Sequence, residues 1–145
     1  MDTIVVVGAA IIRRGQLLAA QRNRPRALAG GWELPGGKVD PGETDTEALV
    51  RECREELGVD VQPGTRVGGD WPLQPGAILR VWTAELVRGE PAPLEDHAAL
   101  RWLAAGELAD VAWLDSDRRV VAALAPLLRA GERELDTPIL GESPR

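Results

Sequence analysis

Apolar and polar positions follow one another along the chain in blocks that predict a mixture of strands and helices. The first apolar run, residues 4–12, is rich in valine and isoleucine and predicts a buried strand. Arg14 and Gly15 then predict a tight turn, and residues 16–21 return as a second strand. Residues 22–31, with a proline and paired glycines, predict a loop. The chain is therefore expected to open with two strands and a long loop.

A helix with both ends marked is expected next. Residues 32–34 predict a short strand, which the following Pro-Gly-Gly sequence ends. Thr44 and Glu47 match a capping box, in which a hydroxyl and a carboxylate satisfy free backbone amides at the start of a helix. Apolar positions recur on one face over residues 45–57, and Gly58 is a typical stop. The pattern predicts a helix over 45–57.

The second half of the chain predicts further strands and a C-terminal helix. The expected extended segments are residues 59–61, 66–71 (separated from the first by Pro63-Gly64), 78–87 and 100–103. A helical turn is expected over 104–108 and a helix over 116–128, which Pro126 must kink or restart. The pattern predicts a single α/β sandwich with a mixed sheet over residues 1–130, and a loosely ordered tail over 131–145.

Composition and charge narrow the class of protein. The chain has 145 residues, of which 44% are apolar and 28% charged, which suits one globular domain. A net charge of -6 argues against a nucleic-acid polymer as partner, but not against a small anionic ligand held by a metal. The single cysteine excludes an internal disulfide and favours a reducing compartment. The N-terminal apolar run is too short to span a bilayer, so a cytoplasmic monomer or homodimer is expected.

Three glutamates on the expected helix are candidate metal ligands. Glu52, Glu55 and Glu56 stand at positions i, i+3 and i+4, so their carboxylates share one face. Arg51 can reach Glu55 one turn on, but one arginine does not neutralise three carboxylates. Hard oxygen ligands that converge suit Mg²⁺ or Mn²⁺. Taken alone, the helix fits a solvated charged face at least as well.

The residues before the helix change this balance. Counted from Gly37, the chain reads G-x5-E-x7-R-E-C-x-E-E-x-G-V without a gap, and this resembles the Nudix box of the Nudix hydrolases. Cys53 stands where Ile, Leu or Val is usual, but a buried thiol acts as a small hydrophobe. The segments AQR, WELPGGK, DHAALRW and DVAWLDSDR extend the resemblance over residues 3–130. They are similar to the MutT-like branch, and most of all to its bacterial CTP/dCTP pyrophosphohydrolases.

The resemblance implies a Nudix-type α/β/α sandwich with a loop–helix–loop site for Mg²⁺, for which Mn²⁺ can substitute. The metal ligands that it implies are the Gly37 carbonyl and the carboxylates of Glu52, Glu55, Glu56 and Asp96, with Glu95 as the alternative to Asp96. It also implies that Arg51 orients the glutamates and that Glu43 supports the loop from behind, through Arg51. Glu52 is the first candidate for the general base and Glu55 the second.

Two cationic residues are candidates for phosphate contacts. Arg22 matches an arginine that contacts the phosphates in MutT-like enzymes. Lys38 is the single lysine beside sixteen arginines, and a compact ammonium suits a phosphate oxygen; an indifferent surface lysine is the alternative. Arg80 points either into the nucleotide cleft or into solvent.

Two further residues are candidates for contacts with the base. An ionised Asp117 only accepts hydrogen bonds, which suits the N4 amino group of cytosine, whereas its alternative role is to complement a helix dipole. Trp32 either stacks on a base or fills the core. His97, the one histidine, is expected to make a structural hydrogen bond rather than to shuttle protons.

The leading hypothesis is a Mg²⁺-dependent pyrophosphohydrolase that converts CTP, dCTP or a 5-substituted dCTP to the monophosphate and pyrophosphate. A MutT-type hydrolase that removes 8-oxo-dGTP is the first alternative. A pyrophosphatase for ADP-ribose or nucleotide sugars comes third. A non-catalytic nucleotide sensor belongs to a different class, and the intact glutamates argue against it.

Overall fold

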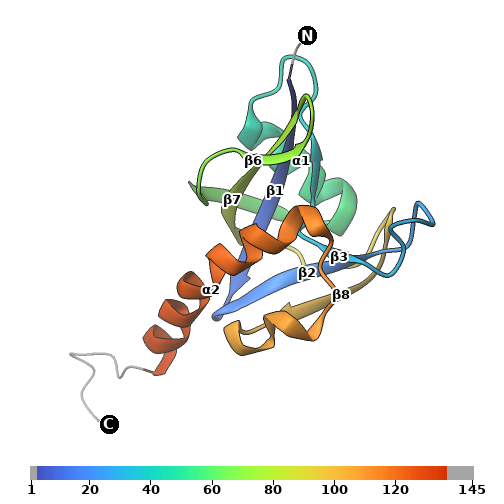
Figure 1. The fold of residues 1–145 in the computed structure, drawn as a ribbon. Coiled ribbons are helices and arrows are strands. Elements are labelled where there is room, and N and C mark those ends of the chain that lie inside the picture. The colour runs from blue at the N-terminus through green and yellow to red at the C-terminus, as the bar shows by residue number, and fades with distance from the viewer. Residues whose placement is uncertain (1–2, 137–145) are drawn as a thin grey trace.

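The computed structural model describes residues 3–136, which form a mixed sheet with helices on both sides (Figure 1). The strands are β1 (Ile4–Arg13), β2 (Gln16–Arg22), β3 (Trp32–Glu33), β4 (Gly36–Lys38), β5 (Asp60–Arg66), β6 (Trp71–Gln74), β7 (Ala77–Arg88) and β8 (His97–Leu103). The helices are α1 (Asp45–Leu57), the 3-10 helix η1 (Ala105–Asp110) and α2 (Asp115–Asp136). The expected α/β class with a mixed sheet is confirmed. Within this part of the chain, no helix combines the length and apolarity needed to cross a bilayer.

Strand β1 runs through the middle of the sheet, whose strand order is β3-β2-β1-β7-β5. β1 and β7 are parallel, from Ile4 opposite Ala77 to Ile11 opposite Ala84, while the other pairs are antiparallel. The short strand β4 also pairs with β1 and sets Gly37 opposite Val7. This pairing fixes the segment that leads into α1 against the centre of the sheet.

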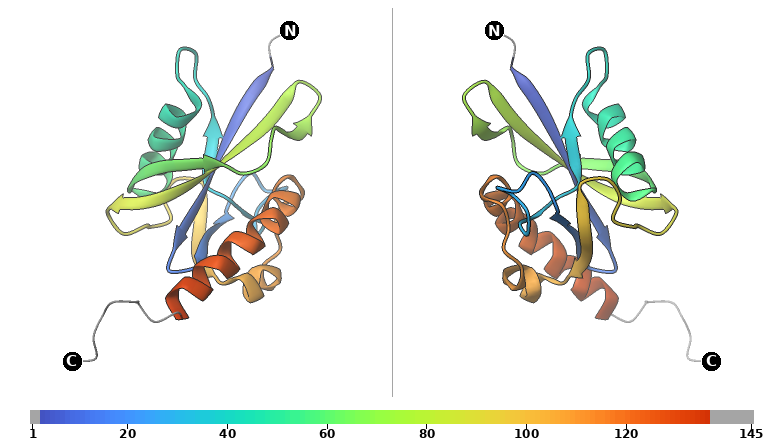
Figure 2. Two further views of the ribbon diagram at one scale, coloured as in Figure 1. Left: turned by 90° about the vertical axis from the view of Figure 1, so that its left-hand side faces the viewer. Right: turned by 90° about the vertical axis from the view of Figure 1, so that its right-hand side faces the viewer.

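The two long helices lie on opposite sides of the sheet, as the side views of Figure 2 show. Leu49 and Leu57 of α1 are fully buried in one apolar cluster, and Leu124 and Leu128 of α2 in the other. Each such side chain contributes about 2–3 kcal/mol of hydrophobic stabilisation. Cys53 is also fully buried under α1, where burial raises the pKa of its thiol to about 12. It therefore packs as a small hydrophobe rather than reacting.

The strands are longer or more numerous than the sequence pattern predicts. β5 passes through Pro63-Gly64, which were expected to interrupt it, because β5 ends the strand order and an edge strand tolerates a proline. β4 forms where the Pro-Gly-Gly sequence was expected only to end a strand. β8 begins at His97 rather than at residue 100. Residues 67–70, which were expected to be extended, instead form the loop between β5 and β6, and β6 forms a hairpin with β7 from Trp71 on.

Helix α2 was expected to end near residue 128, but it continues to Asp136, and it runs through Pro126 without the restart that was one of the two expected effects of this proline. The proline costs about 3 kcal/mol in a helix interior, but the burial of Leu124 and Leu128 around it offsets that cost. The Glu132 carboxylate then accepts the Ala105 N–H at 3.2 Å, which ties the last turns to η1. Residues 131–136 are thus helical rather than loose, and 137–145 lie outside the described residues.

Candidate active site

Helix α1 carries the three candidate glutamates, and its own sequence fixes where it begins and ends. The Thr44 hydroxyl accepts the Glu47 N–H at 3.2 Å, and the Glu47 carboxylate accepts the Thr44 N–H at 2.9 Å. Gly58 ends the helix in the left-handed region at φ 70°, where glycine has no steric penalty. The expected capping box and stop are confirmed, so the positions of the glutamates follow from local sequence.

A single guanidinium, that of Arg51, joins the loop before α1 to the glutamates on it. Its Nε and Nη2 donate to the two oxygens of Glu43 at 2.7 and 3.0 Å, and Nη2 also donates to the Lys38 carbonyl at 3.0 Å. Its Nη1 donates to Glu52 at 3.0 Å and to Glu55 at 3.2 Å. The contact with Glu43 holds the pKa of that carboxyl below its usual range. The side chain of Arg51 thus connects the loop before α1 with two of the glutamates on the helix.

The three glutamates of α1 occupy different environments. Glu55 is 46% exposed, whereas Glu52 is only 14% exposed and Glu56 7%. Desolvation raises the pKa of Glu52 above its usual value and the pKa of Glu56 to about 8. Glu56 Oε2 accepts the Gly36 N–H at 3.0 Å, which offsets only part of that desolvation. Burial therefore disfavours the charged form of both carboxyl groups unless a cation compensates it.

The Gly36-Gly37 pair lets the backbone approach these carboxylates closely. A Cβ at Gly37 would lie 2.5 Å from the Glu52 carboxyl carbon, and one at Gly36 would lie 1.9 Å from the Val7 carbonyl oxygen. Any larger residue at either position would displace its neighbour. The Gly37 backbone is consequently held beside Glu52.

The loop before β8 brings Glu95, rather than Asp96, toward α1. The Leu94 N–H donates to the Glu56 carbonyl at 3.0 Å, and the Glu95 carboxylate contributes to the raised pKa of both Glu52 and Glu56. Glu95 has φ 51°, a conformation uncommon for a residue other than glycine. The Asp96 carboxylate pairs instead with Arg24 and lies 3.8 Å from Arg22. The structure thus brings the alternative residue to the glutamates and not the expected one.

Arg22 takes part in a partly buried cluster that the sequence pattern did not predict. Glu33 Oε2 accepts from Arg22 Nη1 at 2.9 Å and lies 2.8 Å from His97 Nε2. Glu33 is not among the site residues predicted from the sequence. Its place directly before Leu-Pro-Gly-Gly, at the end of a short expected strand, was a signal that could have identified it. His97 makes a structural hydrogen bond, as expected.

Asp117 is 6% exposed at the start of α2. Its Oδ2 accepts the Leu34 N–H at 2.8 Å and its Oδ1 accepts the Ser116 hydroxyl at 2.8 Å. Burial raises its pKa to about 6, against the lowering effect of these two hydrogen bonds. The carboxylate thus ties the first turn of α2 to the turn between β3 and β4.

The remaining candidates lie in different surroundings. Lys38 is exposed on β4. The backbone of Trp32 pairs with the segment before α2: its N–H donates to the Ala112 carbonyl, and its carbonyl accepts the Leu114 N–H. Its side chain packs against the cluster beneath α2, which favours the core alternative. Arg80 donates to Asp70 at 2.9 Å and to Asp45 at 3.2 Å, so it points neither into an open cleft nor freely into solvent.

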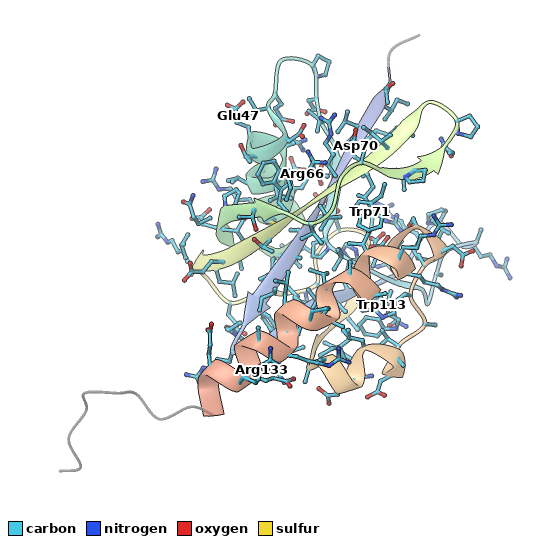
Figure 3. The ribbon with its side chains drawn as sticks, turned by 60° about the vertical axis from the view of Figure 1, so that its left-hand side comes forward. Glu47, Arg66, Asp70, Trp71, Trp113 and Arg133 are labelled. Carbon is cyan, nitrogen blue, oxygen red and sulfur yellow. The ribbon has the colours of Figure 1, made fainter. Side chains whose placement is uncertain are left out.

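Two cavities border the start of α2. One of about 580 Å³ lies between the loop after β2 and the segment before α2, and its wall includes Leu28, Glu33, Trp113 and Ser116. The other, of about 340 Å³, lies between β6 and α2 beside Trp71. Figure 3 shows Trp71 and Trp113 on either side of the first turns of α2.

The carboxylates of Glu52, Glu55 and Glu56 are chemically suited to bind a hard divalent cation, although they do not converge on one point. Within residues 3–136, no three His, Cys, Asp or Glu side chains are arranged to hold a metal ion. Arg51 holds Glu52 and Glu55, and the Gly36 N–H holds Glu56. Carboxylate oxygens are nevertheless the ligands that Mg²⁺ and Mn²⁺ prefer.

Comparisons with known proteins agree with this geometry. The NUDIX domain family model matches residues 2–124. A putative 8-oxo-dGTP diphosphatase 2 of Mycobacterium tuberculosis is 47% identical over 134 residues, which cover 90% of this chain and 94% of that protein. A CTP pyrophosphohydrolase of Escherichia coli is 41% identical over 104 residues, 70% of this chain and 76% of that protein. The solution structure of the E. coli ORF135 protein superposes with a TM-score of 0.73 at 34% identity, covering 90% and 94% of the two chains. The chain therefore belongs to the Nudix family of hydrolases.

Proposed function

We propose that the protein is a Mg²⁺-dependent pyrophosphohydrolase of nucleoside triphosphates, with cytosine nucleotides as preferred substrates and the monophosphate and pyrophosphate as products. The observation that carries the proposal is the charge on one face of α1. The guanidinium of Arg51 contacts two carboxylates on α1 and, in the loop before it, those of Asp40 and Glu43. Burial also raises the pKa of two glutamates on the helix. A divalent cation with a polyphosphate is the ligand that would compensate this arrangement.

The residues proposed to hold the cation are the Gly37 carbonyl, Glu52, Glu55 and Glu56, with Glu95 nearer to them than Asp96. When bound, the cation would supply an activated water and neutralise charge on the leaving phosphate. Arg51 keeps the glutamates in register with the loop through its bidentate contact with Glu43. Mn²⁺, which accepts the same oxygen ligands, is expected to substitute.

Glu52 is the proposed general base, ahead of Glu55. Desolvation moves the pKa of Glu52 upward, toward the range in which a carboxylate is a better proton acceptor. Glu55 is more exposed and Glu56 is tied to the Gly36 N–H, so each is less suited to that role. Arg22 at the end of β2 and the exposed Lys38 on β4 are proposed to contact the phosphates.

The base preference rests on carboxylates that accept and do not donate hydrogen bonds. Asp117 lies at the start of α2 and Glu33 on the wall of the 580 Å³ cavity. An acceptor there favours a base that presents N–H donors, such as the N4 amino group of cytosine. The second candidate substrate is 8-oxo-dGTP, which the name of the 47%-identical relative favours and whose base also carries N–H groups.

A substrate panel tests the base preference. With Mg²⁺, we expect dCTP, CTP and 5-methyl-dCTP to give the highest kcat/KM, ahead of dTTP, 8-oxo-dGTP and ADP-ribose. Preference for 8-oxo-dGTP would keep the proposed metal site and overturn the cytosine assignment. Turnover of ADP-ribose alone would overturn the triphosphate assignment.

Asp117→Asn is expected to weaken the preference for cytosine nucleotides about tenfold, since loss of a hydrogen bond to a charged group costs roughly 1.5–3 kcal/mol. The measurement is the ratio of kcat/KM for dCTP to that for 8-oxo-dGTP. An unchanged ratio would show that Asp117 only fixes the start of α2.

The same variant should change how stability depends on pH. The pKa of Asp117 is about 6 in the folded chain and near 3.8 when unfolded, so the unfolded chain loses this proton first as pH rises. Asp117 therefore lowers the free energy of unfolding as pH rises from about 4 to about 6, by up to about 3 kcal/mol. Urea unfolding of wild type and Asp117→Asn across this range measures the difference. Equal slopes would contradict the buried environment of Asp117.

A further inference from the structure

Three adjacent strands place one buried histidine behind Arg22. Arg22 lies opposite His97 where β2 pairs with β8, and Ala20 lies opposite Glu33 where β2 pairs with β3. The side chains of Arg22, Glu33 and His97 meet at a single carboxylate oxygen, Glu33 Oε2, at 2.9 and 2.8 Å. The His97 side chain has no exposed surface at all.

The hydrogen bonds fix the role of each histidine nitrogen. Arg22 donates to Glu33 Oε2, so this carboxylate acts as an acceptor, and the hydrogen in the contact with His97 must be on Nε2. His97 Nδ1 is buried and has no hydrogen-bond partner among the described residues. A second hydrogen on Nδ1 would thus be a buried donor without an acceptor. His97 therefore acts in this position as a hydrogen-bond donor to Glu33.

Two donors on one oxygen restrict Glu33 strongly. Two contacts fix the Arg22 side chain: its Nε donates to the Arg24 carbonyl at 2.8 Å, and its Nη1 donates to Glu33. The other Glu33 oxygen has no hydrogen-bond partner in the described part of the chain, and Glu33 lines the 580 Å³ cavity. One carboxylate therefore both orients the arginine and offers an acceptor to the cavity.

We propose that His97 is a positioning residue for nucleotide binding, which acts by holding Glu33 and through it Arg22. This inference rests on the proposed function, since it takes Arg22 as a phosphate contact. Without the His97 donor, Glu33 keeps only its contact with Arg22, and both side chains gain rotational freedom that binding must remove. A histidine that only fills the core would affect stability and leave nucleotide binding unchanged.

Two variants separate these roles. His97→Leu replaces the imidazole with an apolar side chain of similar size that has no hydrogen-bond donor. It is expected to raise the KM for dCTP about tenfold, the lower end of the effect typical of residues that support a binding group. The kcat should fall less than about threefold, because the charges on α1 are unaffected. His97→Gln, which can place an amide N–H near the Nε2 position, should restore the KM to within about threefold of wild type.

A stability control and a second mutation complete the test. Leu128→Ala truncates a fully buried side chain of α2 and serves as the stability control. It should lower the Tm while leaving the KM within about twofold of wild type. In a Glu33→Ala background, His97→Leu should no longer change the KM, because the two effects share one contact. Full additivity, or a His97→Leu variant with an unchanged KM, would overturn the inference.

Binding of a non-hydrolysable α,β-methylene dCTP with Mg²⁺ separates this inference from the proposed function. Calorimetry should show a dissociation constant about tenfold higher for His97→Leu than for wild type and restored by His97→Gln. Equal dissociation constants would overturn the positioning role even if wild type turns over dCTP. Absence of both binding and turnover in wild type would overturn the proposed function together with this inference.

Discussion

Glu56→Gln is expected to reduce kcat/KM for dCTP about 1000-fold, equivalent to about 4 kcal/mol of transition-state stabilisation. The amide has nearly the same size, and its oxygen can still accept the Gly36 N–H that Glu56 accepts at 3.0 Å. Since burial already raises the pKa of Glu56 to about 8, a neutral group suits this environment and the fold should persist. The change removes only the negative charge proposed to bind the cation.

The matched control is Glu47→Gln on the same helix. Glu47 is exposed and caps α1, and glutamine serves in a capping box as glutamate does. Steady-state kinetics with Mg²⁺, beside thermal unfolding without it, should show the control within about twofold of wild type. A folded Glu56→Gln variant with full turnover would contradict the metal-site assignment.

Gly37→Ala is expected to lower kcat/KM about 100-fold with little loss of stability, since small displacements of reacting groups have effects of that size. The added Cβ would lie 2.5 Å from the Glu52 carboxyl carbon. That carboxyl group is at the end of a flexible side chain, so it would move away while the backbone stays in place. The proposed base and cation ligand would then be misplaced in an otherwise intact fold.

Gly106→Ala is the control for this change, because a Cβ at Gly106 meets nothing within 4 Å. It should keep both the Tm and kcat/KM of wild type. Measurement of both quantities for each variant separates a local displacement from unfolding. Wild-type kinetics in Gly37→Ala would show that the position of Glu52 does not matter to turnover.

The geometry around α1 could be predicted from the sequence because it depends on local interactions. The capping box at Thr44, the stop at Gly58 and helical periodicity together fix which glutamates share a face. The contact of Arg51 with Glu43 also spans only eight residues and follows from the loop–helix resemblance. The positions of the glutamates and of Arg51 were therefore predictable from interactions between residues that are close in sequence.

What the sequence could not predict depends on distant pairing or on single backbone angles. Glu33 and His97 are 64 residues apart and meet only because β3 and β8 both pair with β2. The positive φ of Glu95 directs Glu95 and Asp96 to different partners, which a linear pattern does not encode. Arg80 donates to Asp70 of the β5–β6 loop and to Asp45 of α1. Asp70 also accepts from Arg66, and Figure 3 shows these two residues side by side. The length of α2 was likewise not predictable from local sequence, because tertiary packing stabilises the helix on both sides of Pro126.

The most direct test of the account is the identity of the products formed from dCTP with Mg²⁺ and with EDTA. We predict dCMP and pyrophosphate in equal amounts with Mg²⁺, no turnover in EDTA, and recovery when Mg²⁺ or Mn²⁺ is restored. Release of orthophosphate, or cleavage that persists without a divalent cation, would contradict the account. Binding of nucleotides without any turnover would instead indicate a sensor.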